Sequence, residues 1–302
     1  MGIGRAGGRS RVAAVLVALA AGLALASPAP SGAAAPGAPT ASAASAALPQ
    51  MVATGPDYMK GSASYGGTLT AMVAARQPQF TGGTLQWYRG GTAIPGATGR
   101  TYKPTPADVG QKIRFVAMLT RSGFETQRAV SQPTPPIAHA SPLKRTVRYD
   151  VRVDATGTIP AAEVETFVAQ AQQTYDDARG WRAGGTAFTR TSRSQSQFTL
   201  VLATSDRMTS YSSVCSAQWS CRVGRNVIIN WTRWKTASPA WNAAGGSLRD
   251  YRHMVVNHET GHWLGRGHAG CSRQGALAPV MMQQSKGLGG CRFNPWPLPS
   301  ER

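Results

Sequence analysis

Acidic residues are scarce in this chain of 302 residues. It has 13 Asp and Glu against 32 Lys and Arg, so its formal net charge is +19 at pH 7. Without the three Arg of the first 33 residues, 29 basic and 13 acidic residues leave +16. Such a charge favours anionic surroundings, such as cell-wall polymers or acidic substrates, although an Arg-rich surface is also common without any partner. No Lys/Arg block or groove-reading motif is present, which argues against a specific nucleic-acid partner.

Long hydrophobic runs are equally few. The first one, from Val12 to Ala26, has 15 residues, fewer than the roughly 20 that span a bilayer. Three Arg precede it and small residues follow, which is the pattern of a secretory signal peptide. We therefore predict a signal peptide over residues 1–33, with an uncleaved N-terminal anchor as the alternative. Residues 34–48, rich in Ala, Pro and Ser, are predicted to be a disordered linker.

The rest of the chain contains no second run of spanning length. We expect the protein to be secreted, extracellular or associated with the cell wall, and not an integral membrane protein. Only four cysteines occur, Cys215, Cys221, Cys271 and Cys291. An even number in an exported chain indicates two disulfides, with three possible pairings. The local pairings, Cys215–Cys221 and Cys271–Cys291, are favoured because each closes a short loop.

Histidine is also rare, but three of the five histidines lie in one motif. Residues 258–268 read H-E-x-x-H-x-x-G-x-x-H. On a helix, His258 and His262 leave the same face one turn apart and can reach one zinc ion. Gly265 is expected to end the helix, so that the chain turns and brings His268 round as the third ligand. Three protein ligands and an open position are typical of a catalytic Zn²⁺ site, and cysteine ligands are then not required.

Glu259 follows the first of these ligands and is placed to take a proton from a metal-bound water. The extended motif resembles that of the metzincin zinc peptidases. That resemblance implies a methionine turn beneath the zinc, for which Met281 is the candidate and Met282 the alternative. Some metzincins have a Tyr just after this turn, whereas this chain has Gln283 and Gln284. Residues 140–302 also resemble a secreted actinobacterial metzincin-like family of unknown function.

Residues 49–138 show short β-type runs separated by Gly and Pro. Strands are predicted over residues 67–73, 84–89 and 112–118, with Trp87 in the core. The order G-x-T-L-T-A, Q-W-x-R, I-x-G-A-T, A-D-V-G resembles a bacterial Ig-like cell-surface module. The resemblance implies an all-β Ig-like sandwich that acts as a spacer or in adhesion.

Residues 139–302 mix strand and helix patterns, so the chain as a whole is predicted to be α+β. Residues 146–153 are expected to form an edge strand and Pro160 to start a helix, while residues 198–203 and 227–231 are expected to be strands. Ser247 to Asp250 resembles a capping box that opens the zinc helix. The metzincin resemblance implies a mixed sheet, two main helices and an irregular C-terminal subdomain.

Together these patterns predict a secreted zinc-dependent endopeptidase. Its substrate is a protein or peptide, and the motif supplies the metal ligands and Glu259 as general base. One alternative is a non-catalytic, zinc-stabilised protein that binds the cell wall. Another is a zinc hydrolase of cell-wall peptides, which the positive charge leaves open.

Overall fold

The computed structural model describes residues 47–302, so the predicted signal peptide and most of the predicted linker lie outside the described residues. The fold is mixed α+β, with several sheets and few helices. Buried side chains form two large clusters, one within residues 51–137 and one within residues 147–281. We call residues 51–138 the β region and residues 145–302 the C-terminal region.

The β region consists of short antiparallel strands. One sheet has the order β2-β3-β7, a second has the order β6-β5-β8-β9, and β1 pairs with β4. Side chains from both larger sheets meet around Trp87, which is fully buried and stacks on Tyr102. The strands are β1 Val52–Ala53, β2 Tyr58–Gly61, β3 Leu69–Met72, β4 Arg76–Gln77, β5 Gly82–Arg89, β6 Thr92–Ala93, β7 Thr101–Tyr102, β8 Ile113–Thr120 and β9 Gln127–Val130.

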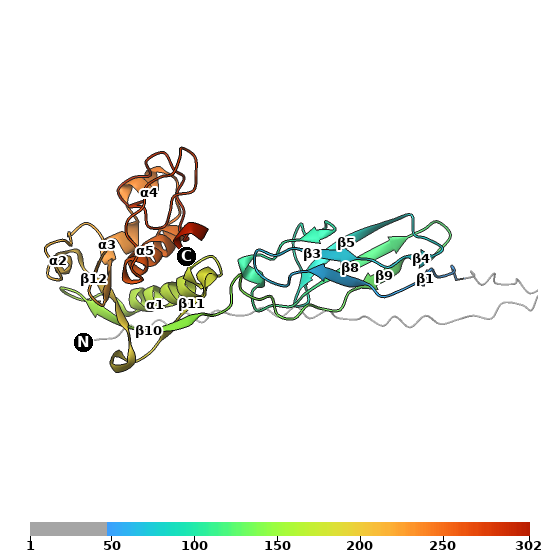
Figure 1. Ribbon diagram of the computed structural model, residues 1–302, viewed down its shortest axis with the longest axis horizontal. Helices are drawn as coiled ribbons and strands as arrows, with labels where there is room; N and C mark the ends of the chain where they lie inside the picture. The colour runs from blue at the N-terminus through green and yellow to red at the C-terminus, as the bar shows by residue number, and fades with distance from the viewer. Residues whose placement is uncertain (1–46) are drawn as a thin grey trace, which may run out of the picture. The chain divides into compact units, whose positions relative to one another are not determined.

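The C-terminal region contains a five-stranded sheet with the order β11-β10-β12-β14-β13 (Figure 1). Four strands run parallel, and β13 pairs antiparallel with β14 at one edge. The central strand β12 is buried along its whole length, as expected for a strand covered on both faces. The strands are β10 Arg145–Asp154, β11 Thr186–Arg190, β12 Phe198–Ala203, β13 Cys221–Val223 and β14 Asn226–Asn230.

One sequence prediction about this sheet is wrong. The segment 146–153 lies within β10, which has β11 and β12 on its two sides and is not an edge strand. Its apolar and polar residues alternate because Val147 and Tyr149 face the core while Arg148 is exposed. Alternation therefore reports that one face of a strand is covered, and it says nothing about the strand's position in the sheet.

Two 16-residue helices pack on the sheet and on each other, α1 Ala161–Asp176 and α5 Leu248–Trp263. The predicted apolar face of α1 is turned inward, with Phe167, Ala171 and Tyr175 buried. Ser247 caps α5 by accepting the backbone N–H of Asp250, as the capping pattern predicted. The shorter helices are α2 Ser205–Met208, α3 Trp231–Thr236 and α4 Pro239–Ala243, with 3-10 turns η1 Pro106–Asp108, η2 Trp181–Gly184, η3 Arg193–Gln195 and η4 Pro299–Glu301.

After α5 the chain has almost no regular structure until η4 (Figure 1). A single bridge between Leu277 and Arg292 and a disulfide organise this segment. Among residues 47–302, no helix has both the length and the apolar character needed to cross a membrane.

Candidate metal centre

Helix α5 presents two histidines on one face. His258 and His262 are one turn apart, and their ring centroids are 4.7 Å from each other. His258 is buried, with 8% of its surface exposed, and His262 is half-buried. The side chain of His258 is thus surrounded by the protein interior, whereas that of His262 lies closer to solvent.

The helix ends at the glycine of the motif. Gly265 has a φ of 90°, in the left-handed region that favours glycine, and the backbone N–H of Arg266 returns to the carbonyl of Gly261 at 2.9 Å. This turn reverses the chain, and the N–H of Ala269 then reaches the carbonyl of Met281 at 3.1 Å. The reversal brings His268 back to the two histidines of the helix.

The three imidazoles converge through one kind of atom. The Nε2 atom of His262 lies 3.2 Å from that of His258 and 3.1 Å from that of His268. Tetrahedral zinc with Zn–N bonds of 2.0–2.1 Å separates its nitrogen ligands by about 3.3 Å. These three residues can therefore hold one metal ion.

The remaining ring nitrogens show that the converging atoms carry lone pairs. Nδ1 of His258 donates to the carbonyl of Val280 at 2.8 Å, and Nδ1 of His262 donates to the carbonyl of Arg266 at 2.8 Å. In neutral imidazoles this places both protons on Nδ1 and leaves Nε2 as an acceptor. Two acceptors at this distance cannot hydrogen-bond to each other, so the arrangement fits a cation between them.

Burial keeps the histidines in the form that binds metal. It lowers the pKa of His258 to about 3, and it also lowers the pKa values of His262 and His268 below their ordinary value. All three are neutral at pH 7, so no proton has to leave before a metal ion binds there.

Glu259 lies beside this cluster in the same cavity. Its side chain is 5% exposed, and it forms no hydrogen bond or ion pair with another residue of the described range 47–302. Burial raises the pKa of Glu259 to about 8, and the nearby positive charge of Arg222 only partly offsets this effect. Its carboxyl faces the cavity without a protein partner and has a raised pKa, which is typical of a group kept for chemistry.

The segment 279–282 passes beneath the helix. A Cβ atom placed on Gly261 would overlap the Sδ atom of Met281, so this methionine packs directly against the helix between His258 and His262. Both methionines are buried, and Met282 but not Met281 lines the cavity. The structure therefore gives the two methionine candidates different positions, with Met281 under the helix.

The buried carboxylate of Glu301 binds the backbone of this segment. Glu301 accepts the backbone N–H of Val280 at 3.0 Å, that of Met281 at 2.8 Å and that of Leu298 at 2.7 Å. The carbonyl of Val280 in turn accepts Nδ1–H of His258. Glu301 is thus linked to the metal centre through one peptide unit, a role that no local sequence pattern predicts.

A cavity of about 400 Å³ opens over the histidines. Its apolar part includes Trp219, Met254 and Val255, and its charged side chains besides Glu259 are Arg222 and Lys286. Sequence reasoning missed both cations, because neither lies within the motif. Arg222 is on the edge strand β13, and Lys286 follows the two methionines in the chain.

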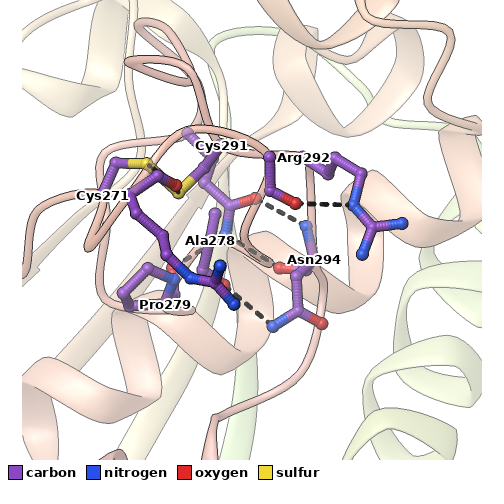
Figure 2. Close-up of a disulfide and its surroundings, with 9 residues drawn as sticks. Cys271, Ala278, Pro279, Cys291, Arg292 and Asn294 are labelled. Atoms are coloured by element: carbon purple, nitrogen blue, oxygen red, sulfur yellow. Dashed lines mark hydrogen bonds between the residues drawn. A yellow bond between two sulfur atoms is a disulfide. The ribbon is translucent and has the colours of Figure 1, made fainter.

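Two disulfides support the cavity, with the local pairings that the sequence favoured, Cys215–Cys221 and Cys271–Cys291. The first closes a loop in the cavity wall. The second closes the loop that contains Met281 and Lys286, and Figure 2 shows its surroundings. There the amide of Ala278 donates to the carbonyl of Arg292 at 2.9 Å, and Nδ2 of Asn294 donates to the carbonyl of Ala278 at 2.9 Å.

The two glutamines after the methionines differ in what they can do. Gln284 is fully buried, and its amide is engaged with Pro279 and Asn294. Gln283 is exposed and lines the cavity, so it is the amide that remains available there.

His253, on the same helix, is directed elsewhere. Its Nδ1 atom lies 2.8 Å from the hydroxyl of Thr174, and its ring lies over Trp296 with a centroid distance of 4.8 Å. The helical spacing explains this, because a residue five positions before His258 lies on a different face.

The chain matches one protein family, described as protein of unknown function (DUF3152), over residues 116–290. The match begins within β8 of the β region and ends just before Cys291, and it covers more than half of the chain. No curated protein matches the chain. The histidine cluster, Glu259 and the segment under α5 all lie within the matched residues, and by this match the chain belongs to the DUF3152 family.

Proposed function

We propose that this protein is an exported zinc metalloendopeptidase of the metzincin type. One observation carries the proposal: three histidines bring their Nε2 atoms together, beside Glu259, whose carboxyl has no partner within residues 47–302. The turn at Gly265 and the methionine under the helix agree with the metzincin resemblance of the motif.

The donor set favours zinc over other metals. Magnesium and calcium prefer oxygen ligands, whereas this cluster offers only imidazole nitrogen. Imidazole suits zinc, copper, iron and nickel, and three histidines with one free position are typical of catalytic zinc. His258, His262 and His268 would hold the ion, and the carbonyls of Val280 and Arg266 fix the first two rings.

The residues of the chain then have distinct tasks in peptide hydrolysis. When bound, zinc polarises a carbonyl and lowers the pKa of water toward about 7. The positive charge of a bound ion would favour the ionised form of Glu259, and this carboxylate would accept the proton of the attacking water and return it to the leaving amine. Glu259 lines the cavity, and the apolar side chains of the cavity accept part of the substrate.

Metal content and peptide cleavage, measured on the same samples, test the proposal. The wild-type protein should contain about one zinc per chain and cleave casein or a peptide library. Glu259→Gln should keep the zinc and lose about 10²–10⁴-fold in kcat/KM, the range for removing a general base. His262→Ala should lose the zinc itself. His253→Gln is the matched control, because this histidine lies on the same helix but does not face the cluster.

Two results would reject the proposal. Wild-type protein without stoichiometric zinc would contradict the metal assignment. Zinc-loaded protein that cleaves no member of the library would contradict the peptidase and favour a metal-stabilised binding protein. The two disulfides agree with an oxidising compartment, so the protein should be produced by export rather than in the cytoplasm.

A further inference from the structure

The charged residues of the cavity are unbalanced. Glu259 is the one carboxylate among its lining residues, and Arg222 and Lys286 are exposed at its surface. Neither cation forms an ion pair or a side-chain hydrogen bond with another residue in the described part of the chain. Several other arginines of the same region are paired with acids, such as Arg207 with Asp154. The cavity therefore offers two cations without carboxylate partners.

The two cations approach the histidines from different elements. Arg222 belongs to the edge strand of the sheet, whereas Lys286 belongs to the loop closed by Cys271–Cys291. Both line the cavity that opens over the histidines, so a peptide that crosses the histidines can meet both cations.

We propose that the cavity selects peptides with Asp or Glu close to the scissile bond, and that Arg222 and Lys286 bind these carboxylates. This inference rests on the proposed peptidase function. A guanidinium group can bind a carboxylate with two parallel hydrogen bonds, and the half-buried Trp219 lines the same cavity. The overall positive charge attracts acidic peptides to the whole molecule, so a test has to separate the cavity from the general field.

Pairs of peptides that differ only by Glu or Gln at one position provide this test. The wild-type protein should cleave the Glu peptide with about tenfold higher kcat/KM for at least one position on each side of the scissile bond. Arg222→Glu should abolish the preference on one side, and Lys286→Glu on the other. Arg193→Glu makes the same change of net charge at an exposed residue outside the cavity, and it should keep both preferences.

Binding to a zinc-loaded Glu259→Gln variant separates the two proposals. A labelled Glu peptide should bind this variant more tightly than its Gln partner, and Arg222→Glu or Lys286→Glu should remove the difference. Equal cleavage of Glu and Gln peptides by the wild type would overturn the selectivity and leave the peptidase standing. If no peptide is cleaved, the peptidase fails, and equal binding of the two peptides would then overturn the selectivity as well.

A different observation assigns a role to Glu301. Its carboxylate accepts three backbone N–H groups while it is only 9% exposed, in a chain with 13 acidic residues in total. Two of these groups belong to Val280 and Met281, and the carbonyl of Val280 orients the ring of His258. We infer that Glu301 is a positioning residue, which sets the affinity of the metal centre through this peptide unit.

Zinc affinity, measured by competition with a chelator, tests the inference. Partners that orient a ligating histidine typically contribute 10–100-fold to metal affinity, so Glu301→Ala should weaken zinc binding by that factor. Glu301→Gln keeps one acceptor oxygen and should lose less. The absorption spectrum of the cobalt-substituted protein should change in Glu301→Ala, because the geometry at His258 changes.

Arg302→Ala is the matched control for the same tail. Its guanidinium donates to the carbonyls of Pro297 and Arg179 and forms no hydrogen bond with residues 280–281. It should keep the wild-type zinc affinity. Wild-type affinity in Glu301→Ala, or an equal loss in Arg302→Ala, would overturn the inference. If Glu301→Ala does not fold, an unchanged affinity and cobalt spectrum in Glu301→Gln would overturn it.

Discussion

Asp108 in the β region and Glu259 in the C-terminal region are both buried carboxyl groups, but their surroundings differ completely. Asp108 accepts hydrogen bonds from Nε of Arg89 at 2.6 Å, from the hydroxyl of Tyr102 at 2.6 Å, and from the backbone and hydroxyl of Thr105. Glu259 accepts none from the described residues. Asp108 thus connects three parts of the β region by hydrogen bonds, whereas Glu259 faces a cavity without a protein partner.

Burial acts on both carboxyl groups, but the pKa values of Asp108 and Glu259 shift in opposite directions. Burial raises the pKa of Asp108, but the hydrogen bonds from Arg89, Tyr102 and Thr105 outweigh it and hold the pKa below its usual value. Burial of Glu259 meets only the weaker opposing effect of Arg222, so its pKa rises to about 8. The comparison shows that the number of partners, and not burial alone, separates a structural acid from a candidate catalytic one.

The largest effect on the β region is expected from Asp108→Ala. The change leaves the buried hydroxyl of Tyr102 and the amide of Thr105 without their acceptor, and a broken buried pair costs 3–5 kcal/mol. We expect a loss of about 3–4 kcal/mol in the free energy of unfolding, because Arg89 is 32% exposed and regains water. Urea denaturation measures it. Glu125→Ala, a less buried acid of the same region, should change stability by no more than about 0.5 kcal/mol.

The disulfides sharpen the comparison, because all four cysteines lie in the C-terminal region. The loop-closure entropy of the unfolded chain assigns about 3 kcal/mol of stability to Cys271–Cys291, whose sequence separation is 20. It assigns about 2 kcal/mol to Cys215–Cys221, whose separation is 6. We expect the double change of Cys271 and Cys291 to Ser to increase amide hydrogen exchange in the C-terminal region alone. Faster exchange in the β region would contradict the view that the regions have separate cores.

Acid should weaken the two regions at different pH values. Burial lowers the pKa of His253 to about 4, below its unfolded value of about 6.5. The stability that comes from neutral His253 is therefore complete above pH 6.5 and is lost as the pH falls toward 4, by at most about 1.4 kcal/mol per pH unit. The pKa of Asp108 is also lowered, but its unfolded value is about 3.9, so its contribution is lost only below that pH.

His253→Gln provides the control for this difference. The variant should show a flatter dependence of unfolding free energy on pH between 6.5 and 4, since one of the buried histidines that titrate there is gone. Asp108→Asn should keep the wild-type slope in this window and change it only in stronger acid. If the unfolding free energy of His253→Gln depends on pH as steeply as that of the wild type, another group causes the loss of stability between pH 6.5 and 4.

How far the sequence predicts the site depends on how local each interaction is. The spacing of residues 258–268 predicts the cluster because helical periodicity and the turn at Gly265 involve only near neighbours. Glu301 contacts a segment some twenty residues away, and nothing in its own neighbourhood indicates this. Arg222 reaches the cavity only because β13 adds to the sheet next to β14. Contacts of this kind follow from tertiary structure and not from local pattern.

The smallest expected effect, and the one of opposite sign, concerns Glu259. A buried carboxyl without a partner costs free energy, so Glu259→Leu should stabilise the metal-free protein by about 1 kcal/mol, whereas Asp108→Leu should destabilise it. Urea denaturation in the presence of a chelator measures both. Saturating zinc should then raise the stability of both wild type and Glu259→Leu, because the histidines and not Glu259 bind the ion. Loss of the zinc effect in Glu259→Leu would show that Glu259 is a metal ligand, and its role as a free base would have to be abandoned.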